Sequence, residues 1–205
     1  SKLVWNTKKA IIPTSLDSVG LDLLRGRGMS ELQAKSFIRP SYDKDLGDPM
    51  MIEGMDRAVN RIGKAIKNDE KVYIYGDYDI DGISASALLY DAFTQMGLNA
   101  SLYIPDRFEE GYGLNSKALK KLKDDGASLV VSVDCGTTAH KQADYSKKIG
   151  LDLIITDHHE PDGGAPEGAL ACINPKLQKD SKLRELAGVG VAFYLVRALQ
   201  NELSV

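Results

Sequence analysis

Long apolar runs, cysteine and histidine are all scarce in this chain of 205 residues. No apolar run approaches the roughly 18–20 residues that a membrane-spanning helix needs, which argues against an integral membrane protein. The first residues, SKLVWNTKK, lack the apolar core of a secretory signal. The two cysteines, Cys135 and Cys172, form neither a C-x-x-C metal motif nor a disulfide framework. We therefore expect a protein of the reducing cytoplasm.

Positive charge is not in excess either, because the chain has 26 basic and 29 acidic residues and a net charge of −3. This balance argues against a protein that grips nucleic acid over its whole surface, although a local basic track remains compatible with it. It also fits a site in which several carboxylates are held for divalent cations. The hydrophobic fraction of 43% predicts a folded core.

From residue 71 onward, short apolar segments alternate with amphipathic ones. This alternation predicts an α/β fold, with a mainly parallel sheet flanked by helices on both faces. A further helix over 51–66, with Met51 on its apolar stripe, should pack on this sheet. The expected strands are 71–76, 100–104, 128–133, 151–156 and 169–173, and the expected helices are 83–97, 115–126, 140–150 and 185–203.

The first part of the chain has a different character. Glycines and prolines break residues 1–48 into short helical pieces, and SELQ at 30–33 predicts a capping box at the start of one of them. We therefore expect a small helical N-terminal appendage over 1–48. The α/β catalytic domain is expected over 49–205.

Three of the expected strands run directly into acidic residues, and one of them also into two histidines. In an open parallel sheet, residues just past the carboxyl ends of the strands face one crevice, so these side chains should meet. Two of the three histidines of the chain stand side by side in this group. The group consists of Asp77, Asp79 and Asp81 after 71–76, Asp134 after 128–133, and Asp157, His158 and His159 after 151–156.

Carboxylates crowded in this way repel one another, and bound cations are the usual remedy. Carboxylate oxygens combined with an imidazole nitrogen suit Mn²⁺ or Mg²⁺, whereas zinc more often recruits cysteine or further histidines. Two such ions roughly 3.5–4 Å apart, bridged by a carboxylate, form the standard apparatus for hydrolysing a phosphate ester. The pattern thus favours a metal-dependent phosphoesterase.

Each of these motifs also has a purely structural explanation. A D-x-D-x-D stretch is often a calcium-type loop or a solvated turn, Asp134 alone would be a turn former, and Asp157 could cap a strand beside two surface histidines. Their occurrence at successive strand ends favours chemistry, because three structural explanations would have to coincide. The small residues that open the next helix, Gly82 and Ser84, also favour it, since they let backbone N–H groups approach a phosphate. Ser84 is therefore a candidate substrate contact.

The motifs GDYDIDGISASALL, VSVDCG and ITDHHEP resemble the successive motifs of the DHH phosphoesterase superfamily. Within it, the chain is most similar to the RecJ-type single-strand-specific 5′→3′ exonucleases. IPDRFEEGYGLN, INPK and ELAGVGVAF resemble further stretches of that family. The resemblance covers roughly residues 37–200.

Carried over residue by residue, the resemblance implies a set of metal ligands. Asp79 and Asp81 match the metal-binding D-x-D of the family, and Asp134 matches its bridging carboxylate. His158 matches the ligand of the second metal. The implied cofactors are two Mn²⁺ or Mg²⁺ ions, and the acids Asp81 and Asp134 are counted among the catalytic residues.

Other residues are implied to act around the metals. His159 matches the second histidine of the family, expected to face the scissile phosphate as a hydrogen-bond donor or general acid. Asp77 and Asp157 are expected to orient the ligands. Arg107 is the candidate phosphate contact, because a guanidinium group suits an oxyanion. An ion pair with Asp106, Glu109 or Glu110 in the same loop is the alternative for this arginine.

The implied activity is 5′→3′ hydrolysis of single-stranded DNA in repair and recombination. The implied partners are single-stranded DNA, a single-strand-binding protein and a helicase, without a membrane. One alternative is a DHH phosphodiesterase for oligoribonucleotides or cyclic dinucleotides, although those relatives begin the first motif with a His–Pro form and this chain has YGDYDIDG. Another is a RecJ-like scaffold of a replication or repair assembly, although all the acids and both histidines are retained.

The family has a further metal-binding Asp shortly after the LAGVGVAF helix, and then a second domain with a glycine-rich substrate-binding motif. The chain stops at Val205, before both. We therefore expect a fragment that binds metal more weakly than a complete enzyme, and its activity in isolation is left open.

Overall fold

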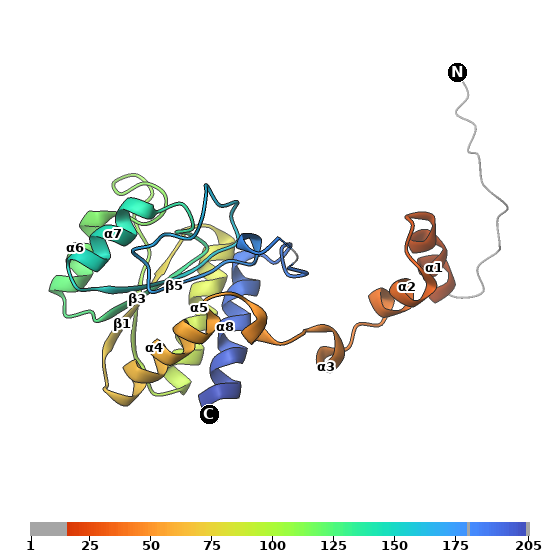
Figure 1. Cartoon of the computed structure of the whole chain (residues 1–205), viewed down its shortest axis with the longest axis horizontal. Coiled ribbons are helices and arrows are strands. Elements are labelled where there is room, and N and C mark those ends of the chain that lie inside the picture. The colour runs from red at the N-terminus through yellow and green to blue at the C-terminus, as the bar shows by residue number, and fades with distance from the viewer. Residues whose placement is uncertain (1–15, 180, 204–205) are drawn as a thin grey trace, which may run out of the picture. The chain divides into compact units, whose positions relative to one another are not determined.

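In a computed structural model of the chain, the structure describes residues 16–179 and 181–203 (Figure 1). The chain divides into two compact units, with the boundary between Asp48 and Pro49. Among the described residues, no helix is long and apolar enough to cross a membrane.

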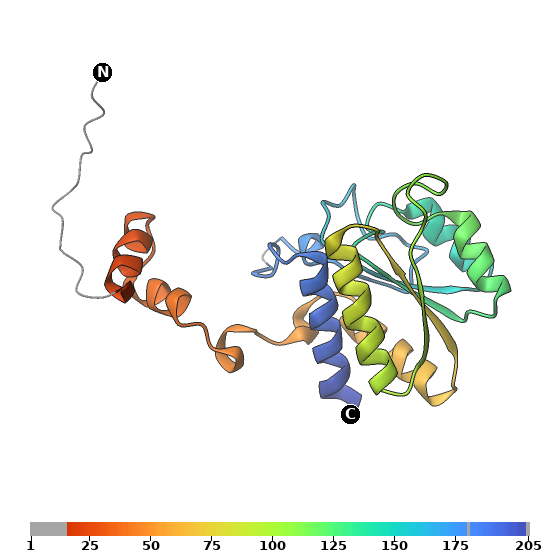
Figure 2. The same cartoon turned by 180° about the vertical axis from the view of Figure 1, so that it is seen from behind.

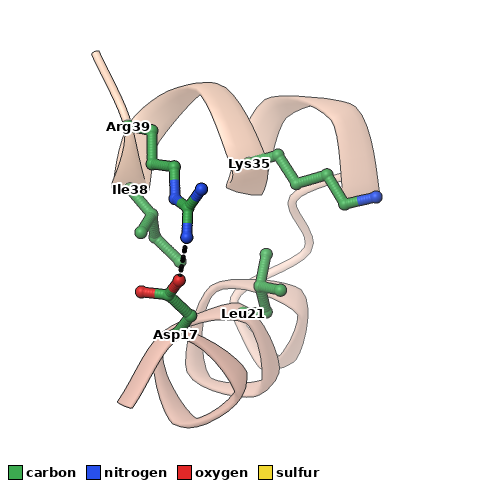
Figure 3. A pocket seen from close by; sticks show the side chains of 5 residues that line it. All are labelled: Asp17, Leu21, Lys35, Ile38 and Arg39. Atoms are coloured by element: carbon green, nitrogen blue, oxygen red, sulfur yellow. Dashed lines mark hydrogen bonds and ion pairs between the residues drawn. The ribbon is translucent and has the colours of Figure 1, made fainter. Parts of the chain in front are cut away.

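Within residues 16–48, the first unit contains three short helices. The predicted capping box is present at the start of the second one, where the hydroxyl of Ser30 accepts from the amide of Gln33 and the Gln33 side chain accepts from the amide of Ser30. An ion pair between Asp17 and Arg39 lies at one side of a small pocket between the first two helices (Figure 3). The helices are α1 (Leu16–Gly26), α2 (Glu31–Ile38) and α3 (Tyr42–Asp45).

The second unit is built on a five-stranded sheet in the order β2-β1-β3-β4-β5, with every neighbouring pair parallel. The parallel α/β fold expected from the alternating pattern is therefore confirmed. Strand β3 is buried along its whole length, as a central strand covered on both faces should be. The strands are β1 (Lys71–Gly76), β2 (Asn99–Tyr103), β3 (Leu129–Val133), β4 (Asp152–Thr156) and β5 (Ala171–Ile173).

Helices cover both faces of this sheet. Figure 1 shows α6 and α7 on one face and α4, α5 and α8 on the other, and Figure 2 shows α5 and α8 packed side by side. Two short 3-10 turns complete the described part of this unit. η1 (Pro49–Met51) precedes its first helix, and η2 (Pro175–Leu177) follows β5. The helices are α4 (Met55–Lys67), α5 (Ile80–Gln95), α6 (Ser116–Asp124), α7 (His140–Lys148) and α8 (Gly188–Leu203).

Three helix starts differ from the expectation by three residues or more. Helix α8 begins at Gly188 rather than at 185. Helix α5 begins at Ile80 rather than at 83, because Asp79 accepts hydrogen bonds from two backbone amides and so acts as the N-cap. Helix α4 begins at Met55, after Gly54 in a left-handed conformation with φ of 83°. The placement of Met51 on the apolar stripe of this helix was wrong, since Met51 lies in η1 and its side chain is 73% exposed.

A buried arginine ties α4 to the amino ends of the strands. Arg61 is 9% exposed, and its guanidinium group lies 2.5 Å from the carboxylate of Asp152 and 2.6 Å from that of Glu70. Burial raises the pKa of Glu70, but hydrogen bonds from Arg61 and Asn68 and the charge of Arg61 outweigh it, and the pKa lies below the ordinary value of 4.5. The cluster thus stabilises the ionised form of Glu70.

We predict that Arg61→Met lowers the free energy of unfolding by about 2 kcal/mol, because it leaves Glu70 without its partner. The exposed arginine of the same helix, Arg57, supplies the control, and Arg57→Met should leave stability nearly unchanged. Urea unfolding followed by circular dichroism measures both. Equal effects of the two substitutions would contradict a structural role for the buried cluster.

The same cluster predicts a pH dependence. Because the pKa of Glu70 is lower in the folded state than in the unfolded state, its contribution is present above pH 4.5 and lost as the pH falls. The stability difference between the parent chain and Glu70→Gln should therefore be present at neutral pH and shrink below 4.5. A difference that grows on acidification would contradict the sign of this pKa shift.

Candidate metal centre

The first acidic stretch lies between β1 and α5. Asp77 is buried, and its Oδ1 accepts from the amide of Tyr78 at 2.7 Å. Asp79 is exposed, and its Oδ1 accepts from the amides of Asp81 and Gly82, both at 2.9 Å. A Cβ atom on Gly82 would lie 2.6 Å from the Cβ of Asp77, so glycine lets α5 begin directly against the end of the strand.

Asp134 follows β3 in an unusual backbone conformation. Its φ is 60°, in the left-handed region that aspartate tolerates better than most residues. Its amide donates to the carbonyl of Thr156 at 2.9 Å, which ties this turn to the end of β4. Asp134 is 1% exposed, and its buried Oδ1 accepts no hydrogen bond, although Nε2 of His158 lies 3.1 Å from it. A buried carboxylate oxygen without a donor is costly, and a bound cation would satisfy it.

Asp157 organises the corner after β4. Its Oδ2 accepts from the amide of Thr137 at 2.8 Å, and its Oδ1 accepts from the amide of His158 at 2.7 Å and lies 2.8 Å from Nδ1 of His159. Burial raises the pKa of Asp157, but hydrogen bonds from His159 and Thr137 outweigh it and hold the pKa at about 2. Because Asp157 stays ionised, Nδ1 of His159 carries the donated proton.

The same hydrogen bond raises the pKa of His159. With Nδ1 bound to Asp157, the ring nitrogen Nε2 is the one left to meet a substrate. This orientation agrees with the expectation that His159 donates a hydrogen bond to a phosphate, a role that stays a prediction.

Asp134 belongs to two groups of donor atoms. Within each group, the donor atoms all lie within 4.8 Å of one another. Nε2 of His158 also lies 3.1 Å from Oδ1 of Asp134 and 3.6 Å from Oδ2 of Asp81. A carboxylate shared between two donor sets is the arrangement of a ligand that bridges two cations. The groups are Asp134, His158 and His159, and Asp77, Asp79 and Asp134.

The structure thus brings together the side chains of all three strand ends. Asp77, which the sequence suggested only as an orienting residue, lies among the possible ligands as well. The individual ligand roles of Asp79, Asp81, Asp134 and His158 remain predictions.

Asp81 is held by a segment far along the chain. The amides of Gly188 and Val189, in the first turn of α8, donate to Oδ2 and Oδ1 of Asp81, each at 2.7 Å. The positive end of a helix dipole stabilises a carboxylate in this position. A Cβ atom on Gly188 would lie 2.5 Å from Oδ1 of Asp134, so α8 approaches both carboxylates. Each oxygen of Asp81 keeps a lone pair for a cation.

Burial, together with the negative charge of the cluster, raises the pKa values of two carboxyl groups. Burial is the main cause that raises the pKa of Asp134 to about 7, followed by the charges of Asp81 and Asp79. Burial is also the main cause that raises the pKa of Asp77. The metal-free cluster therefore retains a proton near neutral pH, and a cation would displace it.

The two other predicted substrate contacts, Ser84 and Arg107, lie in α5 and in the loop after β2. The hydroxyl of Ser84 donates to the carbonyl of Ile80 at 2.6 Å within α5. The guanidinium carbon of Arg107 lies 5.3 Å from the ring centre of Tyr78. Asp106 and Glu110, suggested as ion-pair partners of Arg107, accept instead from backbone amides of their own loop. Phosphate contact by Ser84 or Arg107 stays a prediction.

Some residues around the site were not singled out from the sequence. The buried side chain of Asn174 donates to the hydroxyl of Thr137 at 2.8 Å and to the carbonyl of His159 at 2.9 Å. The hydroxyl of Tyr112 lies 3.4 Å from Nε2 of His159. Asn174 lies in the stretch INPK and Tyr112 in the stretch GYG, and both stretches were noted as similar to the family. Nothing in either stretch indicates that its side chain contacts His159.

The donor set fits the metals that the sequence suggests. Carboxylate oxygens dominate it, with imidazole nitrogen as the only other donor type in the two groups. Such sets suit Mn²⁺ or Mg²⁺. A parallel sheet that gathers these donors at the carboxyl ends of its strands defines a class of protein, the α/β proteins that hold divalent cations for phosphoester chemistry.

Comparison with known families specifies this class. The family model described as "DHH family, N-terminal domain" matches residues 71–204. The chain belongs to the DHH family.

Curated relatives of the chain include single-stranded-DNA-specific exonucleases named RecJ. The Bacillus subtilis protein is 42% identical over 182 residues, which cover 88% of this chain and 23% of that protein. The Escherichia coli protein is 37% identical over 152 residues, which cover 73% of this chain and 26% of that protein. The chain therefore spans about a quarter of the length of these relatives.

Solved structures agree with the fold. A crystal structure of exonuclease RecJ bound to manganese has a TM-score of 0.70 and 31% identity, and the match covers 78% of this chain and 40% of that one. RecJ from Thermus thermophilus in complex with Mn²⁺ has a TM-score of 0.73 and 25% identity, and the match covers 92% of this chain and 25% of that one.

We predict that Asp134→Asn stabilises the metal-free protein at alkaline pH. Because the pKa of Asp134 is about 7 in the folded state and 3.8 ordinarily, the folded state binds more protons between these values and stability falls as the pH rises. At about pH 8 the substitution should raise Tm by roughly 5 °C. Near pH 5, where Asp134 is protonated, the difference should be small.

The same thermal melts, repeated with Mn²⁺, test the ligand role of Asp134. Mn²⁺ should raise the Tm of the parent chain and have little effect on Asp134→Asn. Equal stabilisation of the two proteins by Mn²⁺ would contradict that role.

We predict that Gly188→Ala weakens Mn²⁺ binding by about tenfold, because the added methyl group displaces the amides that hold Asp81. Gly190→Ala, in the same helix turn, is the control, since the nearest atoms to its methyl group would belong to the side chain of Leu186, at 3.1 Å or more. Isothermal titration with Mn²⁺ measures the affinities, and circular dichroism checks the fold. Folded Gly188→Ala with parental affinity would refute the proposed support.

Proposed function

We propose that this chain forms the metal-binding catalytic core of a RecJ-like exonuclease that hydrolyses single-stranded DNA from its 5′ end, in repair and recombination. The observation that carries the proposal is the position of Asp134, which is buried, has an oxygen that accepts no hydrogen bond, and is common to two sets of donor atoms. Similarity to the RecJ proteins supports the choice of single-stranded DNA as substrate.

The geometry supports the following roles. Two Mn²⁺ or Mg²⁺ ions would be held by Asp77, Asp79, Asp81, Asp134 and His158, with Asp134 common to both sets of donor atoms. When bound, the ions would neutralise the phosphate and activate the attacking water. His159, oriented by Asp157, would donate a hydrogen bond from Nε2 to the scissile phosphate.

The proposal extends to the source of the substrate. A nuclease restricted to single strands needs DNA whose strands have been separated and kept apart. We therefore include a helicase and a single-strand-binding protein as partners, and the cytoplasm as the compartment in which they would act together.

The activity can be tested in a chimera in which this chain replaces the matching segment of the Bacillus subtilis relative. With Mn²⁺, the chimera should release nucleotides from the 5′ end of labelled single-stranded DNA and leave duplex DNA largely intact. His158→Ala should lower the rate by about 100-fold, because a metal ligand is lost. The remaining histidine, His140 in α7, supplies the control, and His140→Ala should retain the parental rate.

Different outcomes would exclude different parts of the proposal. Parental activity of His158→Ala would exclude the metal assignment. Release from the 3′ end would exclude the polarity, and equal digestion of duplex DNA would exclude the restriction to single strands. Preference for short RNA or cyclic dinucleotides would favour the alternative phosphodiesterase.

A further inference from the structure

Planar side chains form a continuous row that leads to the candidate metal centre. The guanidinium group of Arg107 lies over the ring of Tyr78, and the ring of Tyr78 meets that of Tyr112 edge to face, with centroids 6.4 Å apart. Tyr112 meets His159 in the same manner at 6.2 Å, and His159 lies 4.7 Å from His158. The row therefore ends at the histidines of the metal centre.

Three separate segments supply this row. Tyr78 comes from the turn after β1, Tyr112 from the loop between β2 and α6, and His159 from the turn after β4. The hydroxyl of Tyr112 lies 3.4 Å from Nε2 of His159, the nitrogen that Asp157 leaves available. The ring of Tyr112 is thus placed one side chain away from the position proposed for the scissile phosphate.

The loop that carries Tyr112 is braced by its own acidic residues. Oδ1 of Asp106 accepts from the amides of Phe108 and Glu109, at 2.8 and 3.1 Å. The carboxylate of Glu110 accepts from the amide of Asp106 at 3.0 Å and from the hydroxyl of Tyr103 at 2.6 Å. These bonds anchor the loop to β2, so its aromatic residues are presented from a fixed base.

The aromatic rings of this loop are open to solvent. Tyr112 is 55% exposed and Phe108 is 95% exposed. Single-stranded nucleic acids are bound by exposed aromatic rings that lie beside a site for the phosphate backbone. The bases stack on these rings, because every base has a π-face. A guanidinium group held over an aromatic ring, such as Arg107 on Tyr78, suits the adjoining phosphate.

We propose that Tyr112 seats the nucleobase next to the scissile phosphate, and that Phe108 offers a second stacking surface in the same loop. The inference rests on the proposed nuclease function and adds a substrate-positioning residue to it. A base stacked on Tyr112 holds its own phosphate toward His159. A paired base has its faces covered by neighbouring pairs, so this seat favours single strands.

The test measures binding of the full chain to a 5′-phosphorylated oligothymidylate with phosphorothioate linkages, which resist hydrolysis. A dye at the 3′ end reports binding by fluorescence anisotropy in the presence of Mn²⁺. In a matched series, one abasic nucleotide replaces thymidine at successive positions from the 5′ end. For the parent chain, affinity should fall by about tenfold when the abasic nucleotide occupies the position that faces Tyr112.

Tyr112→Leu should bind the unmodified oligonucleotide about tenfold more weakly and respond no further to that abasic position. Tyr112→Phe, which keeps the ring and loses the hydroxyl, should retain the parental profile. Phe108→Ala should lose the response at a different position. Tyr90→Leu is the control, because Tyr90 is also exposed but lies well along α5 from Asp79. Circular dichroism checks that each variant is folded.

The outcomes separate this inference from the proposed function. A parent chain that binds the oligonucleotides with equal affinity at every abasic position would overturn the stacking seat alone. Folded Tyr112→Leu that keeps the parental profile, or Tyr112→Phe that loses it, would also overturn it. A parent chain that binds none of the oligonucleotides would overturn the seat, whereas a chimera that does not digest single-stranded DNA would overturn the proposed function.

Discussion

Mutual repulsion among carboxylates is the constraint on which the candidate site depends. Asp77, Asp79, Asp81 and Asp134 converge at the carboxyl ends of β1 and β3, two neighbouring strands. The protein moderates this repulsion with amides of the α5 cap on Asp79, amides of α8 on Asp81, and a pKa near 7 on Asp134. Divalent cations would complete the neutralisation, and the buried Oδ1 of Asp134, which accepts no hydrogen bond, suits such an ion.

The order of the strands determines which residues form the metal centre and which residues surround it. The three central strands, β1, β3 and β4, end in the acids and histidines of the metal centre. The segments that follow the outer strands contribute what surrounds it: the loop after β2 carries Arg107 and Tyr112, and Asn174 follows β5. The centre is thus bordered on both sides, by a candidate DNA-facing loop and by a hydrogen-bonded support.

The support and the chemistry are linked through His159. Asp157 fixes one ring nitrogen, Asn174 fixes the backbone carbonyl of the same residue, and Tyr112 approaches the other ring nitrogen. His159 therefore connects the buried framework, the metal centre and the exposed aromatic row. The histidine pair that this chain shares with the DHH motif is therefore held by specific contacts to Asp157 and Asn174.

Periodicity and strand-end chemistry predicted the parallel sheet, the succession of strands and helices along the chain, and the convergence of the three motifs. These features can be predicted from local patterns, because a buried strand and the turn after it consist of consecutive residues. Tertiary structure alone decided that the amides of Gly188 and Val189 hold Asp81, that Asp134 adopts a left-handed backbone, and that Arg107 stacks on Tyr78. It also decided that Met51 is exposed. These outcomes depend on which segments, distant along the chain, come within contact distance, and local patterns carry no information about that.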